Sequence, residues 1–430
     1  MSKKRGIIWF RQDLRYHDNE ALKEALENFD EIIPVFVFDE RIFEGWQNAL
    51  FPKVFRTRLK FILESVLDLR EELRFRGAEL YVRKGRTEEI IFDLARQYGV
   101  GGVYCSRERM PVGVWLQDNL EVKLWSLGLE LHYFQGKMLF HTSDLPFPIA
   151  RMPDLFSSFR KETVQFVPVR DLLDMPRTNL RIPDIDLEAG EIPTLEDFGY
   201  HTDPKIAFSG GEKMGLAKLQ ETIAKTAGGY EGDLKVSPWL AQGSLSPRKI
   251  YHEISQLPFS LDKLKKQWTN KLMLRDYYRL KSSRNPAALF RPGGWVNKKV
   301  KNQNWNEEDL VVWIRGETGV DFIDACMKCL FHTGFLNHAK RKAVARYLIE
   351  DMGLDWQSGA GYFESVLLDY DPCSNYGNWQ RQAGLSLDLK GAYYYSLENT
   401  IEQEDPEGVF TERWKNEKVD FDFSNQKVVV

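Results

Sequence analysis

The sequence predicts a fold in two parts: an N-terminal α/β domain with a doubly wound parallel sheet, then an all-helical domain. Two observations lead to this prediction. Short apolar runs alternate with amphipathic stretches over the first 135 residues, whereas after residue 211 the β-rich runs disappear and helical patterns follow one another. Strands separated by helices form right-handed crossovers, which produce a parallel sheet covered on both faces.

The elements of the first part follow from the spacing of apolar residues. We predict strands at 6–10, 32–38, 80–83, 102–105 and 129–134, and helices at 19–28, 54–75, 87–98 and 112–127. The turn after the first strand, 11–15, contains no Gly-x-Gly-x-x-Gly and no Walker sequence. A Rossmann dehydrogenase and a P-loop nucleotidase are therefore not indicated, and the sheet alone predicts no function.

Three segments are predicted along the chain: the α/β domain over 1–135, a connector over 136–210 and the helical domain over 211–420. Prolines recur through the connector, which is typical of an irregular chain that wraps a surface. The helical segment has roughly 200 residues, a size that one core can support.

Composition narrows the classes of function. Lys and Arg number 59 against 63 Asp and Glu, a net charge of −4, so the overall charge gives no support to nucleic-acid binding, although a local basic groove is compatible with it. No apolar run reaches the length of a membrane span. Four cysteines are too few for a disulfide framework, which favours a reduced, cytoplasmic protein, with a monomer as the default expectation.

One cysteine pattern is of a kind that can bind a metal ion, but the sequence around it does not support a metal site. Cys326 and Cys329 form a Cys-x-x-Cys, with His332 three residues further on. A structural zinc site needs four ligands, and no further pair follows at zinc spacing. Both cysteines lie in a helical pattern where they would face the core, so we predict no metal.

The helical part carries many tryptophans and one unusually dense segment. Each indole alone is more often packing, but a flat redox cofactor needs aromatic walls with a few polar groups. Segment 368–380, LDYDPCSNYGNWQ, places Asp369 and Asp371 before Asn375 and Trp379. A simpler interpretation is a helix start capped by Asp371 or Ser374, and capping and function can coincide.

This segment resembles the flavin-binding stretch of photolyases and cryptochromes, and the DASH-type branch in particular. Further segments agree with the family in order and spacing: WFRQDLRYHDN at 9–19, LPF and MPDLFSSFRKE within 145–162, SPWLAQGSLSPR at 237–248, and TG, IDA and TGF within 318–335. The resemblance spans residues 5–414. It implies a blue-light flavoprotein with FAD in the helical domain and, in the α/β domain, room for an antenna pigment such as a folate, for which no residue is specified.

The resemblance also implies which residues hold the flavin ring. Asn375 would face flavin N5, where an amide can donate or accept a hydrogen bond. Arg341 and Asp369 would form an ion pair beside the ring, and a fixed cation there stabilises negative charge. Asp371 would bind the pyrimidine edge or the sugar side. Without the resemblance, Arg341 would be taken for a solvated residue of a basic helical run.

Other residues would hold the remaining parts of FAD and carry electrons to it. For the phosphates, the ribityl chain and the adenosine diphosphate portion, the resemblance implies Lys235, Val236, Ser237, Trp268 and Arg275. For photoreduction it implies a chain of three tryptophans: Trp379 next to the flavin, Trp356 in the middle and Trp305 near the surface.

The sequence departs from the family where repair enzymes contact a pyrimidine dimer. The Glu and Trp that bind the lesion are replaced by Lys271 and Leu274, which removes an acceptor and a stacking surface. An Asn-Arg pair is replaced by His338 and Ala339. Lys271 and His338 could instead bind a different anionic or nucleotide substrate, with the imidazole as an acid near neutral pH.

Two further departures concern other parts of the family pattern. The phosphate-side Tyr and Arg correspond to Leu219 and Ile223, and Phe-Asn-Pro near the end reads Tyr-Ser-Leu at 395–397. Three functions therefore stay open. They are light-driven repair of damaged DNA, double-stranded or single-stranded, a photoreceptor that binds FAD without repair, and a relative that binds no flavin.

Overall fold

The computed structural model of the 430-residue chain describes residues 4–43, 50–176, 180, 183, 185–203, 205–230, 232–300, 304–386 and 396–421. Its strands are β1 (Arg5–Phe10), β2 (Glu31–Asp39), β3 (Tyr81–Gly85), β4 (Val103–Ser106) and β5 (Leu131–Phe134). The helices up to the connector are α1 (Glu20–Asn28), α2 (Glu40–Phe43), α3 (Arg56–Phe75), α4 (Thr87–Tyr98), α5 (Pro111–Trp125) and α6 (Phe156–Phe166).

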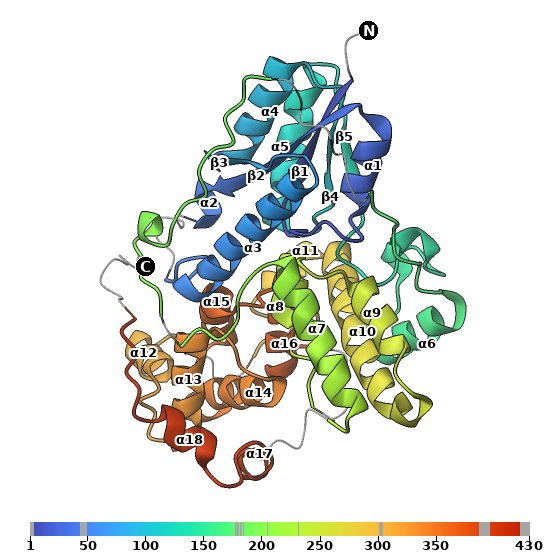
Figure 1. The fold of residues 1–430 in the computed structure, drawn as a ribbon. Coiled ribbons are helices and arrows are strands. Elements are labelled where there is room, and N and C mark those ends of the chain that lie inside the picture. The colour runs from blue at the N-terminus through green and yellow to red at the C-terminus, as the bar shows by residue number, and fades with distance from the viewer. Residues whose placement is uncertain are drawn as a thin grey trace.

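The second half contains helices and no named strand among the described residues. They are α7 (Glu212–Ala227), α8 (Ser237–Gln242), α9 (Pro247–Ser255), α10 (Asp262–Arg284), α11 (Pro286–Phe290), α12 (Glu307–Arg315), α13 (Asp321–Thr333), α14 (His338–Arg346), α15 (Trp356–Val366), α16 (Pro372–Gln382), α17 (Leu397–Glu404) and α18 (Val409–Trp414). An α/β domain followed by a helical domain confirms the predicted fold class (Figure 1).

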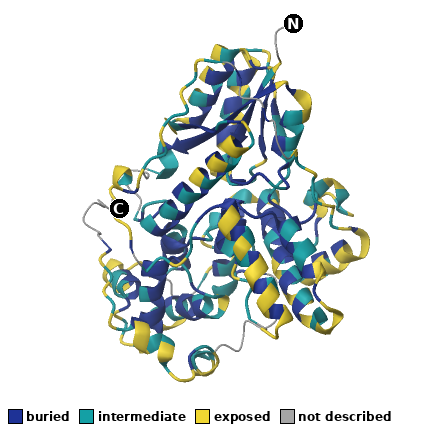
Figure 2. Cartoon of the chain, in the orientation of Figure 1, coloured by how far each residue is buried: buried dark blue, intermediate teal, exposed yellow. Residues whose placement is uncertain are grey.

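The described part of the α/β domain forms a five-stranded parallel sheet in the order β3-β2-β1-β4-β5. Alternate residues of β1 enter two different cores: Ile8 packs with α1 and α3, and Ile7 packs with α4 and α5. Helices thus cover both faces, and β1 and β2 read as nearly continuous apolar runs because they are buried on both sides (Figure 2). The predicted strands and helices recur with ends shifted by one or two residues.

The two domains are joined by buried polar contacts as well as by apolar packing. Helix α3 reaches the helical domain, where the Thr57 hydroxyl donates to the Val366 carbonyl at 2.9 Å (Figure 1). Arg248 pairs with Asp18 at 2.6 Å. The Asp276 carboxylate accepts the backbone N–H groups of the connector at positions 139 and 140, at 2.8 and 3.0 Å. These contacts fix the helical domain against the sheet.

Candidate functional site

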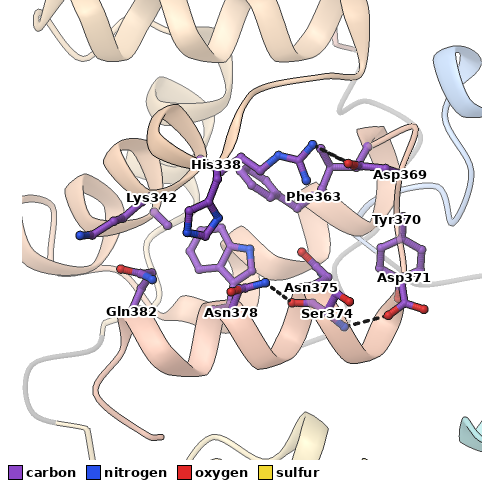
Figure 3. Close-up of a pocket in the computed structure, with 14 residues that line it drawn as sticks. His338, Lys342, Phe363, Asp369, Tyr370, Asp371, Ser374, Asn375, Asn378 and Gln382 are labelled. Atoms are coloured by element: carbon purple, nitrogen blue, oxygen red, sulfur yellow. Dashed lines mark hydrogen bonds and ion pairs between the residues drawn. The ribbon is translucent and has the colours of Figure 1, made fainter. Parts of the chain in front are cut away.

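A pocket of about 80 Å³ opens in the helical domain between α14 and α16. Figure 3 shows His338 and Lys342 on one helix opposite Asn378 and Gln382 on the other. Its lining consists of His338, Arg341, Lys342, Ala345, Phe363, Leu367, Asp369, Tyr370, Asp371, Ser374, Asn375, Asn378, Trp379 and Gln382.

Two capped helix starts position the walls. Asp371 is the N-cap of α16, and its carboxylate accepts the Ser374 backbone N–H at 2.9 Å, so the capping interpretation of this segment is confirmed. Pro372 follows at the first helical position. Asn337 caps α14 in the same manner through the Lys340 N–H at 3.0 Å.

One wall carries a fixed ion pair. Arg341 Nη2 donates to both Asp369 oxygens at 2.8 and 2.9 Å, and its Nε donates to the Leu336 carbonyl at 2.7 Å. The Ser237 hydroxyl donates to Asp369 at 2.6 Å, which brings α8 to the same point. Because its Nε and Nη2 are held by these partners, the guanidinium offers a preorganised positive charge at the pocket wall.

Asn375 and Trp379 form the floor of the pocket from the same face of α16. Both are buried, and the Asn375 amide nitrogen donates to the Ala360 carbonyl at 2.9 Å. This bond fixes the amide and leaves its carbonyl oxygen and second N–H for another partner. The Trp379 ring meets Phe363 edge-on, with ring centroids 5.1 Å apart.

His338 borders the same pocket and retains exposed surface because it faces the hollow. Desolvation by the pocket walls, together with the cations Arg341, Lys271 and Arg381, lowers the pKa of the imidazole to about 4. The ring is therefore neutral at pH 7, which does not support the predicted role as an acid near neutral pH. It remains a hydrogen-bond donor and acceptor.

Several residues expected around FAD lie outside this lining. Val236 and Trp268 are buried in the core beside α10, and Lys235 is exposed with a φ of 53°. Arg275 donates to the carbonyl of Leu240 at 3.0 Å and to that of Lys137. Their predicted roles along the phosphates and the adenosine portion stay predictions.

Neither of the two altered lesion positions, Lys271 and Leu274, belongs to the pocket lining. Lys271 forms an exposed ion pair with Asp233. Leu274 is partly buried against the cluster of Met152, Phe159 and Tyr277 beneath the connector. Leu219 is a core residue of α7, and of segment 395–397 the first residue lies outside the described residues.

The predicted tryptophan chain runs from the pocket floor toward the surface. Trp379 packs against Gly359, which lies one turn after Trp356 on α15. Trp356 is fully buried, and its indole N–H donates to the Pro292 carbonyl at 3.0 Å. Trp305 has 49 % of its surface exposed and follows Asn304, which pairs with Leu354 two residues before Trp356.

Sequence reasoning missed several lining residues, and helical spacing would have found those on α14 and α16. Lys342 lies four residues after His338, and Ala345 lies four residues after Arg341, on the pocket side of α14. Asn378 and Gln382 repeat on the Asn375 and Trp379 face of α16 at intervals of three and four. Residues at i, i+3 and i+4 share a helix face, so two known residues imply their neighbours.

The lining fits the ring system of a flavin. Phe363, Leu367 and Trp379 provide apolar walls, Asn375 retains free hydrogen-bonding capacity, and the Arg341–Asp369 pair supplies a fixed charge. Such a combination of flat apolar walls and a few oriented polar groups is what a redox cofactor requires.

A larger cavity of about 420 Å³ lies between the two domains. The ends of β1 and β2 line it with Phe10 and Asp39, and the helical domain lines it with Tyr370 and Tyr376. Ligands of open parallel sheets bind at the carboxyl ends of the strands, and this cavity occupies that place.

Cys326 and Cys329 are buried, and His332 pairs with Asp203 at 2.7 Å. Across the described ranges, no group of three or more His, Cys, Asp or Glu side chains is arranged to hold a metal ion. Within the same ranges, no helix has the length and apolar character needed to cross a bilayer.

Comparisons with known proteins agree with this architecture. The family described as "FAD binding domain of DNA photolyase" matches residues 268–426, and "DNA photolyase" matches 6–176. Cryptochrome DASH, chloroplastic/mitochondrial, of Arabidopsis thaliana is 35 % identical over 431 residues, which cover 95 % of this chain and 75 % of that protein. Cryptochrome DASH of Synechocystis sp. is 35 % identical over 429 residues, covering 95 % and 86 %.

Solved structures give the same result. The crystal structure of the Synechocystis sp. PCC6803 cryptochrome superposes with a TM-score of 0.88 at 33 % identity, covering 96 % of this chain and 89 % of that one. The archaeal photolyase from Sulfolobus tokodaii, described with two FAD molecules, has a TM-score of 0.79 at 28 % identity, covering 95 % and 90 %. The chain therefore belongs to the photolyase/cryptochrome family, carries its FAD-binding domain and is similar to the DASH-type cryptochromes.

Proposed function

We propose that this protein is a blue-light electron-transfer flavoprotein that binds FAD with its ring in the α14–α16 pocket and does not repair pyrimidine dimers by the family's usual contacts. One observation carries the proposal: Asn375, Trp379 and the Arg341–Asp369 pair converge on one pocket. The positions that would contact a dimer, Lys271 and Leu274, are engaged elsewhere.

Each residue has a physical task in this function. FAD, when bound, supplies light absorption and one-electron chemistry. Arg341 stabilises negative charge on the ring, and Asp369 and Ser237 keep the guanidinium in place. Asn375 presents an amide that tolerates either protonation state beside it. Trp379 lines the pocket, and its readily oxidised indole would be the electron donor beside the ring.

Repair of a DNA lesion, in double-stranded or single-stranded DNA, is the second candidate. It is favoured by the cations at the pocket mouth, where Arg341, Lys271 and Arg381 act on His338 and Lys342 lies on the rim. Phosphate groups are attracted by such clusters even when the net charge of a protein is negative. DNA is accordingly the partner we propose to test.

The interdomain cavity is the place we propose for an antenna pigment of the folate type. Its size and its apolar lining, such as Phe10 and Phe36, suit a flat chromophore, and Glu108 is a polar anchor for a ring N–H. A second light-harvesting cofactor is described for the Sulfolobus tokodaii photolyase, which supports testing this cavity. All four cysteines are free, which supports a reducing compartment such as the cytoplasm.

The absorption spectrum and a repair assay test the proposal. The purified protein should be yellow, release FAD on denaturation and lose the absorption of oxidised flavin under blue light with an external reductant. Light should not remove dimers from single- or double-stranded DNA. Loss of dimers would establish the second candidate instead, and a colourless protein without flavin would overturn both.

A further inference from the structure

Tyr376 stands between the tryptophan chain and a carboxylate. It lies on α16 one turn before Trp379, and its ring meets the Trp356 indole nearly at right angles, with centroids 6.2 Å apart. Its hydroxyl donates a 2.9 Å hydrogen bond to the Glu364 carboxylate. A phenol in ring contact with one redox group and hydrogen-bonded to a base has the two partners that proton-coupled oxidation needs.

We propose that Tyr376 and Glu364 form a proton-coupled electron donor, so that the tryptophan chain has an internal branch ending at Tyr376. This inference rests on the proposed function, because the oxidant is the photoexcited, oxidised flavin acting through Trp379. The electron-transfer chain would then have two ends, Tyr376 in the interior and Trp305 at the surface.

Helix packing brings the members of this branch together. The Trp379 ring lies so close to Gly359 that a Cβ there would be 2.3 Å from it, and Gly359 is one turn from Trp356 on α15. Glu364 projects from the same α15, two turns after Trp356. Two adjacent helices therefore hold both indoles, the phenol and the carboxylate.

The step balances in charge and atoms. An electron passes from the Tyr376 ring to the Trp356 cation radical, which becomes a neutral indole. At the same time the phenol O–H bond breaks, and its proton forms an O–H bond with Glu364 Oε2. The products are a neutral phenoxyl radical and a neutral carboxylic acid, and the only charge that loses its partner is the part-exposed Lys53 ammonium, which water can solvate.

The environment of Tyr376 prevents proton loss before oxidation and permits it afterwards. Desolvation and the nearby Glu364 charge raise the pKa of the phenol well above its ordinary value, so the resting group is protonated. Oxidation makes a phenol a strong acid, and the carboxylate is already hydrogen-bonded to receive the proton. Glu364 lines the interdomain cavity, which gives the proton a route to solvent.

Two neighbouring tyrosines lack one requirement each. Tyr362 contacts Trp313 at 5.7 Å, but its buried hydroxyl has no hydrogen-bond partner in the described part of the chain. Tyr370 also faces Glu364, but the Arg58 guanidinium lies 4.7 Å over its ring and opposes the formation of positive charge there. Tyr362 is therefore the matched control.

The first experiment uses the protein without flavin. Azidyl radicals generated by pulse radiolysis oxidise indoles, and transient absorption then follows the hole as it moves to a phenol. We expect phenoxyl formation in the parent protein and in Tyr362→Phe, its loss in Tyr376→Phe, and a rate about 100-fold lower in Glu364→Gln, the typical effect of removing a positioned proton acceptor. Equal phenoxyl yields in the parent and in Tyr376→Phe overturn the inference.

The second experiment uses the FAD-loaded protein under blue light. Electron paramagnetic resonance of protein labelled with ring-deuterated tyrosine should show a narrowed phenoxyl signal, and its formation should be slower in D₂O. Normal bleaching of the flavin with tryptophan radicals alone overturns the inference and leaves the proposed function intact. Absence of any bleaching overturns the proposed function, while the flavin-free experiment still decides the role of Tyr376.

Discussion

At the scale of single residues, the site depends on groups whose orientation is fixed before any ligand binds. Arg341 is held by the Asp369 carboxylate and the Leu336 carbonyl, and Asn375 by the Ala360 carbonyl. Preorganised dipoles and charges act without reorganisation at the moment of reaction. Substitutions here should therefore alter the photochemistry more than the stability.

Trp379 gives the most direct test at this scale. Replacing it with Phe keeps an apolar ring on the pocket floor but removes the easily oxidised indole, so light-driven bleaching of the flavin should slow strongly while FAD stays bound. Trp414→Phe is the control, because Trp414 is equally buried but stacks on His332, away from the pocket. Equal bleaching rates in both variants would contradict the role of Trp379.

His338 makes a prediction about pH. Its pKa of about 4 lies below the ordinary 6.5, so the unfolded chain binds more protons between these values. The contribution of His338 to the free energy of unfolding should therefore rise with pH over this window, opposite in sign to that of Asp276, and it is lost as the pH falls toward 4. NMR should show the ring titrating near pH 4 in the folded protein, and Arg341→Gln should raise that value. Titration near 6.5 would be the opposite result.

Sequence reasoning at this scale found residues that a motif names and missed residues that only packing brings together. Asp369, Asp371 and Asn375 lie within the single segment 368–380, whose sequence resembles the family motif. Glu364 and Tyr376 belong to two helices, and their hydrogen bond depends on how closely α15 and α16 approach. No local spacing encodes that distance.

At the scale of elements, the approach of α15 to α16 depends on the absence of one side chain. A Cβ at position 359 would lie 2.3 Å from Trp379 and 2.7 Å from Leu348. The glycine weakens helix propensity, yet it allows the indole to reach the pocket floor. Helix existence was predictable from periodicity, whereas this contact was not.

Gly359→Ala should displace Trp379 and destabilise the protein by about 1–3 kcal/mol, the usual cost of overpacking. Gly361→Ala on the same helix is the control, because its nearest neighbour, Phe51, would be at an ordinary 3.5 Å. That variant should be neutral or more stable by up to about 1 kcal/mol through helix propensity. Denaturant unfolding measures both, and equal free energies would contradict the packing argument.

At the scale of the whole molecule, a buried carboxylate links the helical domain to the connector. Asp276 accepts two connector N–H groups through one oxygen, while its other oxygen has no hydrogen-bond partner within the described residues. Burial raises its pKa to about 7 from the ordinary 3.8. The sequence indicated the two domains and their order, but not this link, because it forms only after the domains dock.

Asp276 should make stability decrease as the pH rises. The folded state keeps a proton that the unfolded chain releases between 3.8 and about 7, so the stabilisation is present below this window and is lost as the pH rises through 7. The slope contributed by this group is at most about 1.4 kcal/mol per pH unit. Asp276→Asn should remove it, as measured by unfolding at several pH values. If the free energy of unfolding of Asp276→Asn still decreased with pH over this window, a group other than Asp276 would be responsible.

The interdomain cavity has a consequence for how such a chain can be divided. Its walls come from strand ends of one domain and helices of the other, so each half, expressed alone, would present apolar side chains such as Phe10 and Phe36 to water. In a hybrid that joins the first half of one relative to the second half of another, the two walls of the interdomain cavity would not be complementary. The halves should therefore be exchangeable only when their facing residues are exchanged together.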